Sequence, residues 1–599
     1  MDGSAGHPGN VGQDPDEACT PRISPQAVSN ILTTDTLANT GDFRHGGPAM
    51  NGIDYIAQIL KQEGVEWLAC FPSNPLISAV ARFGIRPVAF RHERGAVMAA
   101  DGYSRISDRQ KFGVCAVQAQ AGAENAMGGI AQAYADNIPI LVFLGGNNLD
   151  RLSVKPNFTA ARNYQGWVKQ VEAIYTPNQV GDVMRRAFHA LRNGTPGPVV
   201  VELIADVCAQ EVPEAARTYK SPKIHRQVPE ASAIEEAAAA LIGAKRPVIW
   251  AGQGVMFSGG TDALRELAEL IAAPVFCTMP GKSAFDERHK LALGAGSGTT
   301  TGPAHEWLTG SDVMLALGSS LTRSPYAQKI RPGKTIIHNT NNPDELNKDE
   351  AADIGLVGDT KLTIQALIEC IKARTAGKGV GERARIEAEV AAAKAKWMAE
   401  WTPALTDNSE PLSYYRVIQA LNETLDLENS IVTHDAGAPR DTIVPFYTAT
   451  TPHSYVGWGK TTHLGFGIPL IIGAKMAHPG KFCMNLMGDG AFGMSGTDIE
   501  TAARSGAAIT TVLLNNSAMA TYSGPTQGTI GKEAREEYGV STMHGDYAKI
   551  AEGMGAVGLR VTTAAELTPA LRQAQKLNAE GRTVLIDVKA NVEDRRSRF

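Results

Sequence analysis

Short apolar stretches recur along this chain and alternate with longer segments whose apolar residues follow a helical period. In the first third, strand-like stretches occupy residues 67–71, 112–117, 140–144 and 199–203, and residues 52–62 have the pattern of an amphipathic helix. Strands without polar alternation, separated by helices, are typical of a parallel sheet covered by helices on both faces. The pattern therefore predicts an α/β fold.

The same alternation occurs three times, which predicts three doubly wound, Rossmann-like parallel-sheet domains. In the second unit we expect strands at 248–251, 275–277, 313–317 and 335–337, and in the third at 431–433, 482–487 and 510–514. The predicted organisation is a disordered extension (1–49), a first domain (50–217), a central domain (230–375), a helical connector (376–408), a third domain (409–588) and a polar, basic tail (589–599).

Composition narrows the class of protein. The 57 Lys and Arg residues nearly balance 62 Asp and Glu residues, giving a net charge of −5, which argues against a nucleic-acid partner. No apolar run is long enough for a membrane span, and no secretory signal is evident. The seven cysteines are scattered and include no CxxC pair, so neither a disulfide framework nor a zinc site is expected. We predict a cytoplasmic enzyme.

Polar residues follow two of the predicted strands in the third unit. Gly488-Asp489-Gly490 ends one strand, and Asn515-Asn516 ends the next after 24 intervening residues. The carboxyl ends of parallel strands are where α/β sheets bind ligands. One carboxylate and one amide oxygen suit Mg²⁺ better than zinc, and glycines let backbone N–H groups approach a diphosphate. We also expect a helix to begin near Thr497, with its positive end directed at the same place.

This motif resembles that of the thiamine diphosphate (ThDP) enzymes, and the resemblance extends from Met50 to Val588 in the acetolactate synthase-like and 2-hydroxyacyl-CoA lyase branch. It implies the domain order pyrimidine-binding, central, diphosphate-binding. It assigns the Mg²⁺ ligands to Asp489, Asn516 and the backbone of Ala518. The other cofactor-binding residues that it implies in the third domain are Ala436, Gly437, Ala438, Gly488, Gly490, Ala491 and Met519.

Further roles follow from the same resemblance. Glu93 is the candidate that exchanges a proton with the cofactor pyrimidine and so activates it. Leu464 is the bulky residue that holds the cofactor in a bent conformation. The carbonyl of Thr462 accepts a hydrogen bond from the 4′-amino group of the cofactor. Gln120 is a candidate substrate donor and His463 a candidate acid/base group, alongside His92 and His434.

The reaction class that the resemblance implies is cleavage or formation of a C–C bond next to a carbonyl through a C2 carbanion/enamine. No His-His pair occurs, and residues 516–523 contain no acid, which weakens a simple decarboxylase hypothesis. The favoured interpretation is a 2-hydroxyacyl-CoA lyase-type carboligase whose basic tail, with Arg595, Arg596 and Arg598, closes over a CoA substrate. The alternatives are an acetolactate synthase acting on 2-oxo acids and a catalytically silent ThDP-binding regulatory protein.

The resemblance also predicts the assembly of the chain and a ligand of the central domain. It implies a homodimer or homotetramer, because the pyrimidine domain of one chain faces the diphosphate domain of another. In the central domain, ADP, CoA or FAD is a candidate ligand, although Gly252-Gln253-Gly254 lacks the complete GxGxxG spacing and Phe285-Asp286-Glu287-Arg288 is only a loose match to an FAD site.

Overall fold

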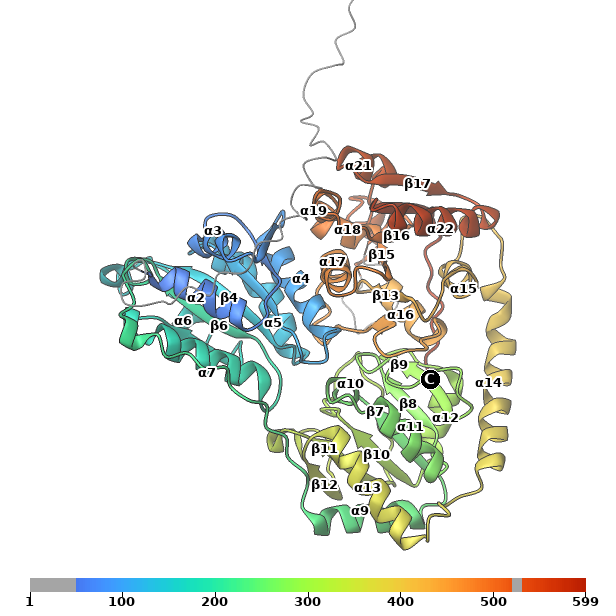
Figure 1. Ribbon diagram of the computed structural model, residues 1–599. Coiled ribbons are helices and arrows are strands. Elements are labelled where there is room, and N and C mark those ends of the chain that lie inside the picture. Colours follow the sequence, from blue (N-terminus) through green and yellow to red (C-terminus); the bar gives the residue numbers. More distant parts are fainter. Residues whose placement is uncertain (1–49, 520–529) are drawn as a thin grey trace, which may run out of the picture. The chain divides into compact units, whose positions relative to one another are not determined.

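Three parallel sheets follow one another along the chain in the computed structural model, which describes residues 50–519 and 530–599 (Figure 1). Each of the three sheets in these residues has six strands, and every strand pairing is parallel. Helices interleave with the strands throughout. The predicted fold class is therefore confirmed, whereas the extension predicted for residues 1–49 lies outside the described residues.

The first sheet has the strand order β2-β1-β3-β4-β6-β5. Its strands are β1 (Trp67–Cys70), β2 (Arg86–Ala89), β3 (Gly113–Val117), β4 (Ile140–Gly146), β5 (Gln170–Ala173) and β6 (Val199–Ile204). The predicted strands are the inner ones, and every residue of β1, β3 and β6 is buried. The two edge strands, β2 and β5, have mixed exposure and polar residues, so no apolar run marks them in the sequence.

The central sheet has the order β12-β11-β10-β7-β8-β9. Its strands are β7 (Pro247–Ala251), β8 (Val275–Thr278), β9 (Ala292–Gly296), β10 (Val313–Leu317), β11 (Thr335–Thr340) and β12 (Ile354–Val357). Helices α9 (Ala231–Gly243), α11 (Thr261–Leu270), α12 (Gly302–Gly310) and α13 (Thr360–Arg374) belong to this part of the chain. Here too the sequence pattern missed the two edge strands, β9 and β12.

The third sheet has the order β14-β13-β15-β16-β18-β17. Its strands are β13 (Ser430–His434), β14 (Tyr455–Val456), β15 (Phe482–Gly488), β16 (Thr510–Asn515), β17 (Val557–Val561) and β18 (Val584–Lys589). β15 lies between β13 and β16, and Gly488 pairs in register with Leu514. The register therefore brings the polar residues that follow β15 and β16 to one edge of the sheet.

Two helices connect the first sheet to the third through close backbone contact. α4 (Glu93–Arg105) packs on α17 (Gly467–Ala477), and their side chains share one hydrophobic cluster. A Cβ at Gly102 would lie 2.1 Å from the carbonyl oxygen of Leu470, and one at Gly473 would lie 1.9 Å from that of Ala99. Only glycine permits this approach. The two helices therefore pack closely enough for their side chains to belong to one continuous hydrophobic core.

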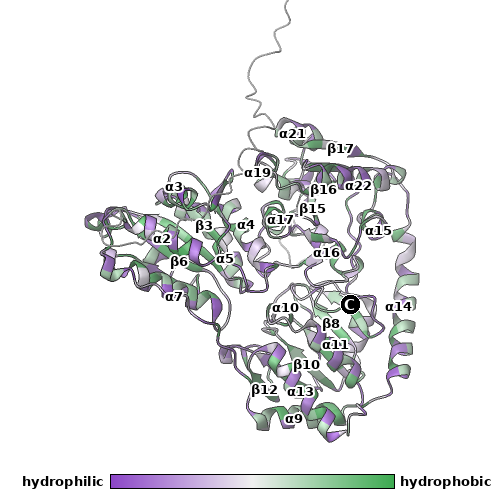
Figure 2. Ribbon diagram, viewed as in Figure 1, coloured by the Kyte–Doolittle hydropathy of each residue, from purple (hydrophilic) through white to green (hydrophobic). Residues whose placement is uncertain are grey.

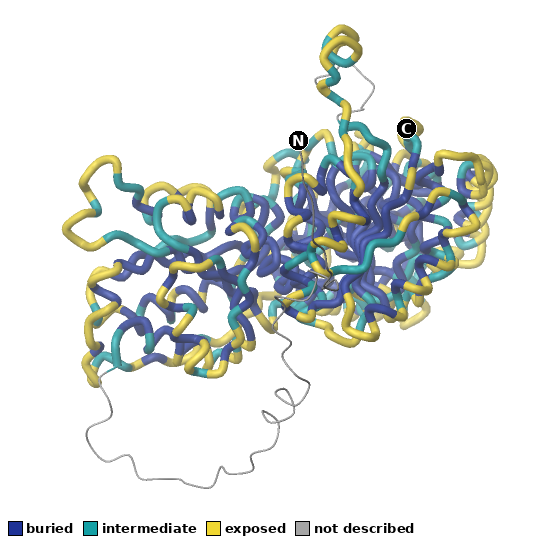
Figure 3. The backbone as a smooth tube through the Cα atoms, turned by 90° about the horizontal axis from the view of Figure 1, so that it is seen from above, coloured by how far each residue is buried: buried dark blue, intermediate teal, exposed yellow. Residues whose placement is uncertain are grey.

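The helical connector α14 (Arg383–Leu405) carries hydrophilic and hydrophobic residues in alternation (Figure 2). Five residues on it are buried: Ile386, Val390, Trp397, Trp401 and Leu405. Their spacing of four or seven residues places them on one face, so the helix packs with a narrow apolar stripe. Figure 3 shows buried segments in the interior and exposed segments along the outside.

The tail predicted at 589–599 packs against this connector and the central part of the chain. The Arg595 guanidinium lies 3.9 Å from the ring centre of Trp401, and the Phe599 ring stacks on His305 at 4.6 Å. Ser597 exchanges hydrogen bonds with the backbone of Thr300 at 2.6 and 2.9 Å. Over the part of the chain that the structure describes, no helix is both long and apolar enough to cross a membrane.

Candidate active site

Asp489 is a buried carboxylate at the edge of the third sheet. It opens the short helix α18 (Asp489–Ser495), directly after β15, and is 1% exposed. Its Oδ1 accepts a hydrogen bond from the backbone N–H of Gly490 at 2.9 Å, but its Oδ2 is buried without a hydrogen-bond partner among the described residues. Burial raises the pKa of this carboxyl. A buried carboxylate oxygen in this state fits a cation ligand, because a cation would compensate its charge.

The loop after β16 lies beside Asp489. Backbone N–H groups of Ser517 and Ala518 oppose the burial effect on the pKa of Asp489, which places this loop next to the carboxylate. The Asn516 Oδ1 accepts from the backbone of Ala518 at 3.0 Å, and its Nδ2 donates to the Tyr414 hydroxyl at 2.9 Å.

Glycine permits a close contact at this edge, because a Cβ on Gly490 would lie 3.0 Å from Met519 Cγ. The structure thus brings together Asp489, Gly490, Asn516, Ala518 and Met519, while residues 520–523 of the acid-free stretch lie outside the described residues. The helix expected near Thr497 is α19 (Asp498–Ser505), but the helix that adjoins the motif is α18, which the sequence did not reveal.

Residues 50–519 and 530–599 contain no cluster of three or more His, Cys, Asp or Glu side chains able to hold a metal. This finding is compatible with the expected Mg²⁺ donors, which comprise a single carboxylate, one amide oxygen and one backbone carbonyl. The orphan Oδ2 of Asp489 is the observation that makes these residues a fitting cation site.

Asp435 joins two loops at the same edge of the sheet. It follows β13, is fully buried, and accepts backbone N–H groups of Ala436 at 2.8 Å, Gly465 at 3.0 Å and Gly467 at 2.8 Å. Burial raises its pKa to about 6, against the opposing effect of these donors. The candidate diphosphate loop, whose Gly437 has φ of 90°, is therefore held beside the segment that carries Leu464.

The segment from Gly459 to Gly465 carries Thr462, His463 and Leu464. Thr462 has a left-handed φ of 55°, which is costly for a β-branched residue and persists where the surroundings impose it. Leu464 is half-buried against the hydrophobic cluster that α4 and α17 share. Burial lowers the pKa of His463, so its imidazole is neutral at pH 7, and its Nδ1 lies 3.2 Å from the Leu464 carbonyl oxygen.

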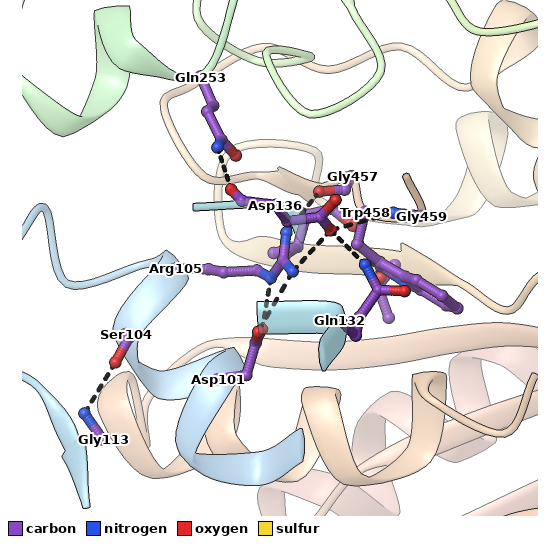
Figure 4. A network of polar contacts seen from close by, with 12 residues as sticks. Asp101, Ser104, Arg105, Gly113, Gln132, Asp136, Gln253, Gly457, Trp458 and Gly459 are labelled. Atoms are coloured by element: carbon purple, nitrogen blue, oxygen red, sulfur yellow. Dashed lines mark hydrogen bonds and ion pairs between the residues drawn. The ribbon is translucent and has the colours of Figure 1, made fainter. Parts of the chain in front are cut away.

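A buried polar network holds this segment against the first sheet's helices (Figure 4). Asp136 accepts the backbone N–H groups of Gly459 and Lys460, each at 3.1 Å, and one N–H of Arg105 at 2.8 Å. Arg105 also pairs with Asp101 and donates to the Gly457 carbonyl at 3.3 Å. Because all three charged groups are buried and paired, the network fixes one position of the loop.

Glu93 is the first residue of α4 and is 2% exposed. It accepts a hydrogen bond from Asn125 Nδ2 at 3.0 Å. Asn125, Gly128 and Gln132 lie along one face of α5 (Ala121–Ala135), since they are three and four residues apart. A Cβ at Gly128 would lie 2.6 Å from His463 Nε2, and Gln132 accepts from the Thr461 hydroxyl at 2.5 Å. One helix face thus connects Glu93 to the loop that carries Leu464.

Three other candidate site residues, Gln120, His434 and His92, make contacts that could not be predicted from the sequence. Gln120 has φ of 55°, and its amide pairs with the Phe158 backbone, accepting from N–H at 3.0 Å and donating to C=O at 3.5 Å. His434 is fully buried and stacks on Trp458, and burial lowers its pKa to about 3. His92 caps α4 by accepting from the Arg94 backbone at 3.1 Å.

A separate cavity of about 160 Å³ lies at the carboxyl ends of β7, β8 and β10 in the central sheet. It is lined in part by Gln253, Ser319, Ser320 and Lys460, and the ammonium of Lys460 lies 3.2 Å from the Ser320 hydroxyl. Gly252 is required by packing, since its Cβ would lie 2.3 Å from the Gly318 carbonyl oxygen. Phe285, Asp286, Glu287 and Arg288 do not line this cavity.

Sequence reasoning missed the residues that position the site rather than contact a ligand. Asp435, Asp136 and Asn125 each bond to a loop or side chain that lies far away in the sequence. Asp435 alone carried a local signal, because it directly follows an apolar strand of the third sheet. Asn125 lies within α5 and Asp136 directly follows it, and the partners of both depend on tertiary contacts.

Comparison with protein families divides the chain into three matches. Residues 50–173 match the N-terminal thiamine pyrophosphate (TPP) binding domain of TPP enzymes, residues 234–367 their central domain, and residues 435–588 their C-terminal TPP binding domain. These three matches occur in the order that the sequence resemblance predicted. Each contains one of the three sheets or most of it.

Several similar proteins carry acetolactate synthase names. A probable acetolactate synthase large subunit of Methanocaldococcus jannaschii is 29% identical, over 88% of this chain and 90% of the relative. The acetolactate synthase isozyme 3 large subunit of Escherichia coli is 27% identical, over 90% and 94%. The large subunit of Lactococcus lactis is 30% identical, over 78% and 80%.

Proposed function

We propose a reaction for this chain, which belongs to the thiamine pyrophosphate enzyme family and is acetolactate synthase-like. The chain decarboxylates one 2-oxo acid and joins the remaining fragment to a second 2-oxo acid. The supporting observation is the similarity to acetolactate synthase large subunits along nearly the whole chain, covering all three sheets. The expected reaction class, C–C bond formation next to a carbonyl, agrees with this family. The proposed substrates are 2-oxo acids.

This proposal replaces the 2-hydroxyacyl-CoA lyase that the sequence favoured. That interpretation rested on a basic tail free to close over a CoA substrate. Instead, Arg595 bonds to Glu400 at 3.3 Å, and Arg598 pairs with the buried Asp441 at 3.2 Å. Two of the three tail arginines therefore already have carboxylate partners, and the relatives above carry the name of the alternative function.

The residues described above fit ThDP with a hard cation such as Mg²⁺. We assign the cation to Asp489, Asn516 and the Ala518 backbone, and the diphosphate to the glycines after β15 and the loop after β13. When bound, ThDP supplies a carbon nucleophile that stabilises negative charge next to a carbonyl. Asp435 and Asp136 orient the loop with Leu464 through hydrogen bonds from its backbone N–H groups.

Glu93 is the proposed proton carrier. Its buried position at the first turn of α4 and its hydrogen bond from Asn125 hold the carboxyl in one orientation. His463, neutral at pH 7, is the proposed acceptor or donor of a substrate proton. Gln120 is assigned to the substrate side of the site, where its contact with Phe158 orders the adjoining loop.

We assign a nucleotide-containing ligand, FAD or the ADP moiety of CoA, to the central cavity. Its position at the carboxyl ends of three parallel strands is the usual one for such ligands. Lys460 presents an ammonium group there for a phosphate. The absorption spectrum of the purified protein tests the flavin, and mass spectrometry of the released small molecules tests ADP and CoA.

The deciding experiment is a substrate panel on the enzyme with ThDP and Mg²⁺. Pyruvate and 2-oxobutyrate are expected to yield acetohydroxy acids, whereas 2-hydroxyacyl-CoA is expected to remain uncleaved. Acyl-CoA cleavage without condensation of 2-oxo acids would restore the lyase hypothesis. ThDP binding without turnover of any substrate would favour the silent regulatory protein.

A further inference from the structure

A second cavity, of about 520 Å³, shares no lining residue with the candidate active site. It lies where the first domain, the linker before the central domain, and the central domain meet. Its basic residues come from different segments: Arg109 after α4, His189 and Arg192 on α7 (Val180–Arg192), and His225 and Arg226 on the linker. The function proposed above uses none of them.

Arg109 supplies positive charge and forms no ion pair among the described residues, although the Asp359 carboxylate acts on it electrostatically. Its guanidinium donates to the backbone carbonyls of Arg192 at 2.6 Å and Gly194 at 3.2 Å, and it forms no ion pair within residues 50–519 and 530–599. Its Nε is buried without a hydrogen-bond partner among those residues. Burial lowers its pKa to about 10, so the group stays charged at pH 7. A half-buried, charged guanidinium without an ion-pair partner fits an anionic ligand.

The backbone holds Arg109 in an unusual conformation. Asp108 and Arg109 have φ values of 47° and 59°, so two successive residues other than glycine are left-handed. Such a conformation costs energy and persists where surrounding contacts impose it. In this conformation the guanidinium of Arg109 points toward the end of α7, where it donates to backbone carbonyls.

The acidic residues that line the cavity are already engaged. Asp108 pairs with His453 at 2.6 Å, outside the basic cluster. Asp359 caps α13 by accepting from the Leu362 backbone at 3.2 Å, and it lies 3.8 Å from Arg226. Arg192 pairs with Glu63. After these pairings, Arg109 and the two imidazoles of His189 and His225 remain without carboxylate partners in the described residues.

The donors surround the cavity rather than forming one planar fork. Arg109, His189 and His225 come from three separate segments, and Asn193 and Asn341 add side-chain amides to the lining. A carboxylate is best matched by a single bidentate arginine, whereas donors that converge from several directions suit a tetrahedral anion. Phe257 and Ile224 give the cavity an apolar wall.

We propose that this cavity, formed by Arg109, His189, His225 and Arg226, binds a phosphate group, either free or on a small phosphomonoester. The site shares no lining residue with the central nucleotide cavity, and the proposal does not rest on the proposed reaction. Since its residues come from the first domain, the linker and the central domain, the bound anion links all three.

The test is calorimetric titration of inorganic phosphate into the enzyme saturated with ThDP and Mg²⁺, so that the diphosphate loops are occupied. Saturable binding is expected. R226Q and H225Q replace exposed linker residues outside the catalytic site, and each is expected to weaken binding about tenfold, as for the loss of one charge-assisted hydrogen bond. R185Q, on α7 and paired with Asp182, is the matched control and is expected to bind phosphate as the unchanged protein does.

Further titrations separate the sources of the ligand. Glycerol phosphate that binds more tightly than phosphate would identify a phosphomonoester, while equal or weaker binding would identify the free anion. Acetate that binds as tightly as phosphate would overturn the proposed class of ligand. Absence of saturable binding, or undiminished binding in both R226Q and H225Q, would overturn the site.

Discussion

At the scale of single residues, two buried carboxylates have different tasks because their partners differ. Glu93 has a side-chain donor, Asn125, at 3.0 Å and lies at the positive end of α4. Asp489 has one satisfied oxygen and one without a hydrogen-bond partner in the described residues. The first arrangement orients a proton-carrying group, whereas the second leaves a carboxylate oxygen available as a cation ligand.

Replacement of Glu93 by glutamine tests the proton-carrying role. The amide still fits beside Asn125 but cannot exchange a proton, so we expect C2 hydrogen–deuterium exchange on bound ThDP to slow by about 100-fold or more. ThDP affinity should change much less. E124Q, on the exposed side of α5, is the control, and exchange in E93Q as fast as in E124Q would assign activation to another group.

Replacement of Asp489 by alanine tests the cation site. We expect the dissociation constant of ThDP in the presence of Mg²⁺ to rise by about 100-fold or more, because loss of a direct ligand weakens binding at least as much as loss of a residue that only supports a ligand, for which the effect reaches about 100-fold. The protein without cofactor should be no less stable, because burial disfavours the charge of Asp489. E552Q is an exposed control, and equal ThDP affinity in D489A and E552Q would contradict the assignment.

At the scale of secondary-structure elements, Asp498 joins α19 to the start of α4. It accepts the Arg91 backbone N–H and the Thr501 hydroxyl, each at 3.0 Å, and a Cβ on Gly95 would lie 2.3 Å from its Oδ2. This close approach buries the carboxyl, and burial raises its pKa to about 6. Arg94 opposes the shift and Glu500 adds to it.

Because the pKa of Asp498 is raised, we expect the free energy of unfolding to depend on pH. Its folded-state pKa lies above the unfolded value near 3.9, so its contribution is complete below about pH 4 and is lost as the pH rises through about 6. Relative to the unchanged protein, D498N should gain about 1.4 kcal/mol in free energy of unfolding between pH 5 and pH 7.5. Urea denaturation at both pH values measures it, and a pH-independent difference would argue against this titration.

The tail is an element that stabilises the fold by packing. Deleting residues 595–599 removes the Arg595–Trp401 and Phe599–His305 contacts and the hydrogen bonds of Ser597. We expect a loss of about 2–4 kcal/mol, since each contact contributes on the order of 1 kcal/mol. The thermal midpoint measures it, with R572Q on the exposed face of α22 (Ala564–Ala579) as control. An unchanged midpoint would show that the tail packs without stabilising.

At the scale of the whole molecule, apolar side chains remain exposed in the first domain. Tyr134, Leu149, Val154, Trp167 and Tyr175 are each 38% to 47% exposed and fall within one stretch of the chain. Large apolar side chains that stay exposed are typical of an interface when they lie together on the surface. They accord with the homodimer or homotetramer that the family resemblance implies.

A charge at this surface tests the assembly. The unchanged protein is expected to run as a dimer or tetramer in light scattering, and W167E should dissociate it, because an interface does not readily bury an unpaired carboxylate. V228E, at an equally exposed position on the linker, should leave the assembly intact. An active monomer at nanomolar concentration would refute a shared active site.

The sequence by itself determined the fold class and all inner strands except β18, because a strand covered on both faces must be apolar throughout its length. It also marked Asp489, Asn516 and Glu93, since their chemistry depends on residue type at the end of a strand or the start of a helix. Edge strands such as β2 and β12 stayed hidden, because one-sided burial leaves a mixed pattern.

Only the tertiary structure decided which groups position the site. Asp136 bonds to Gly459 across 323 residues of chain, and Gly102 meets Leu470 through the packing of two helices. The tail's arginines and Arg109 look alike in the sequence, yet the tail finds carboxylates and aromatic rings while Arg109 faces a cavity. A side chain's local sequence specifies its charge, but its partners depend on which distant segments the packed core brings beside it.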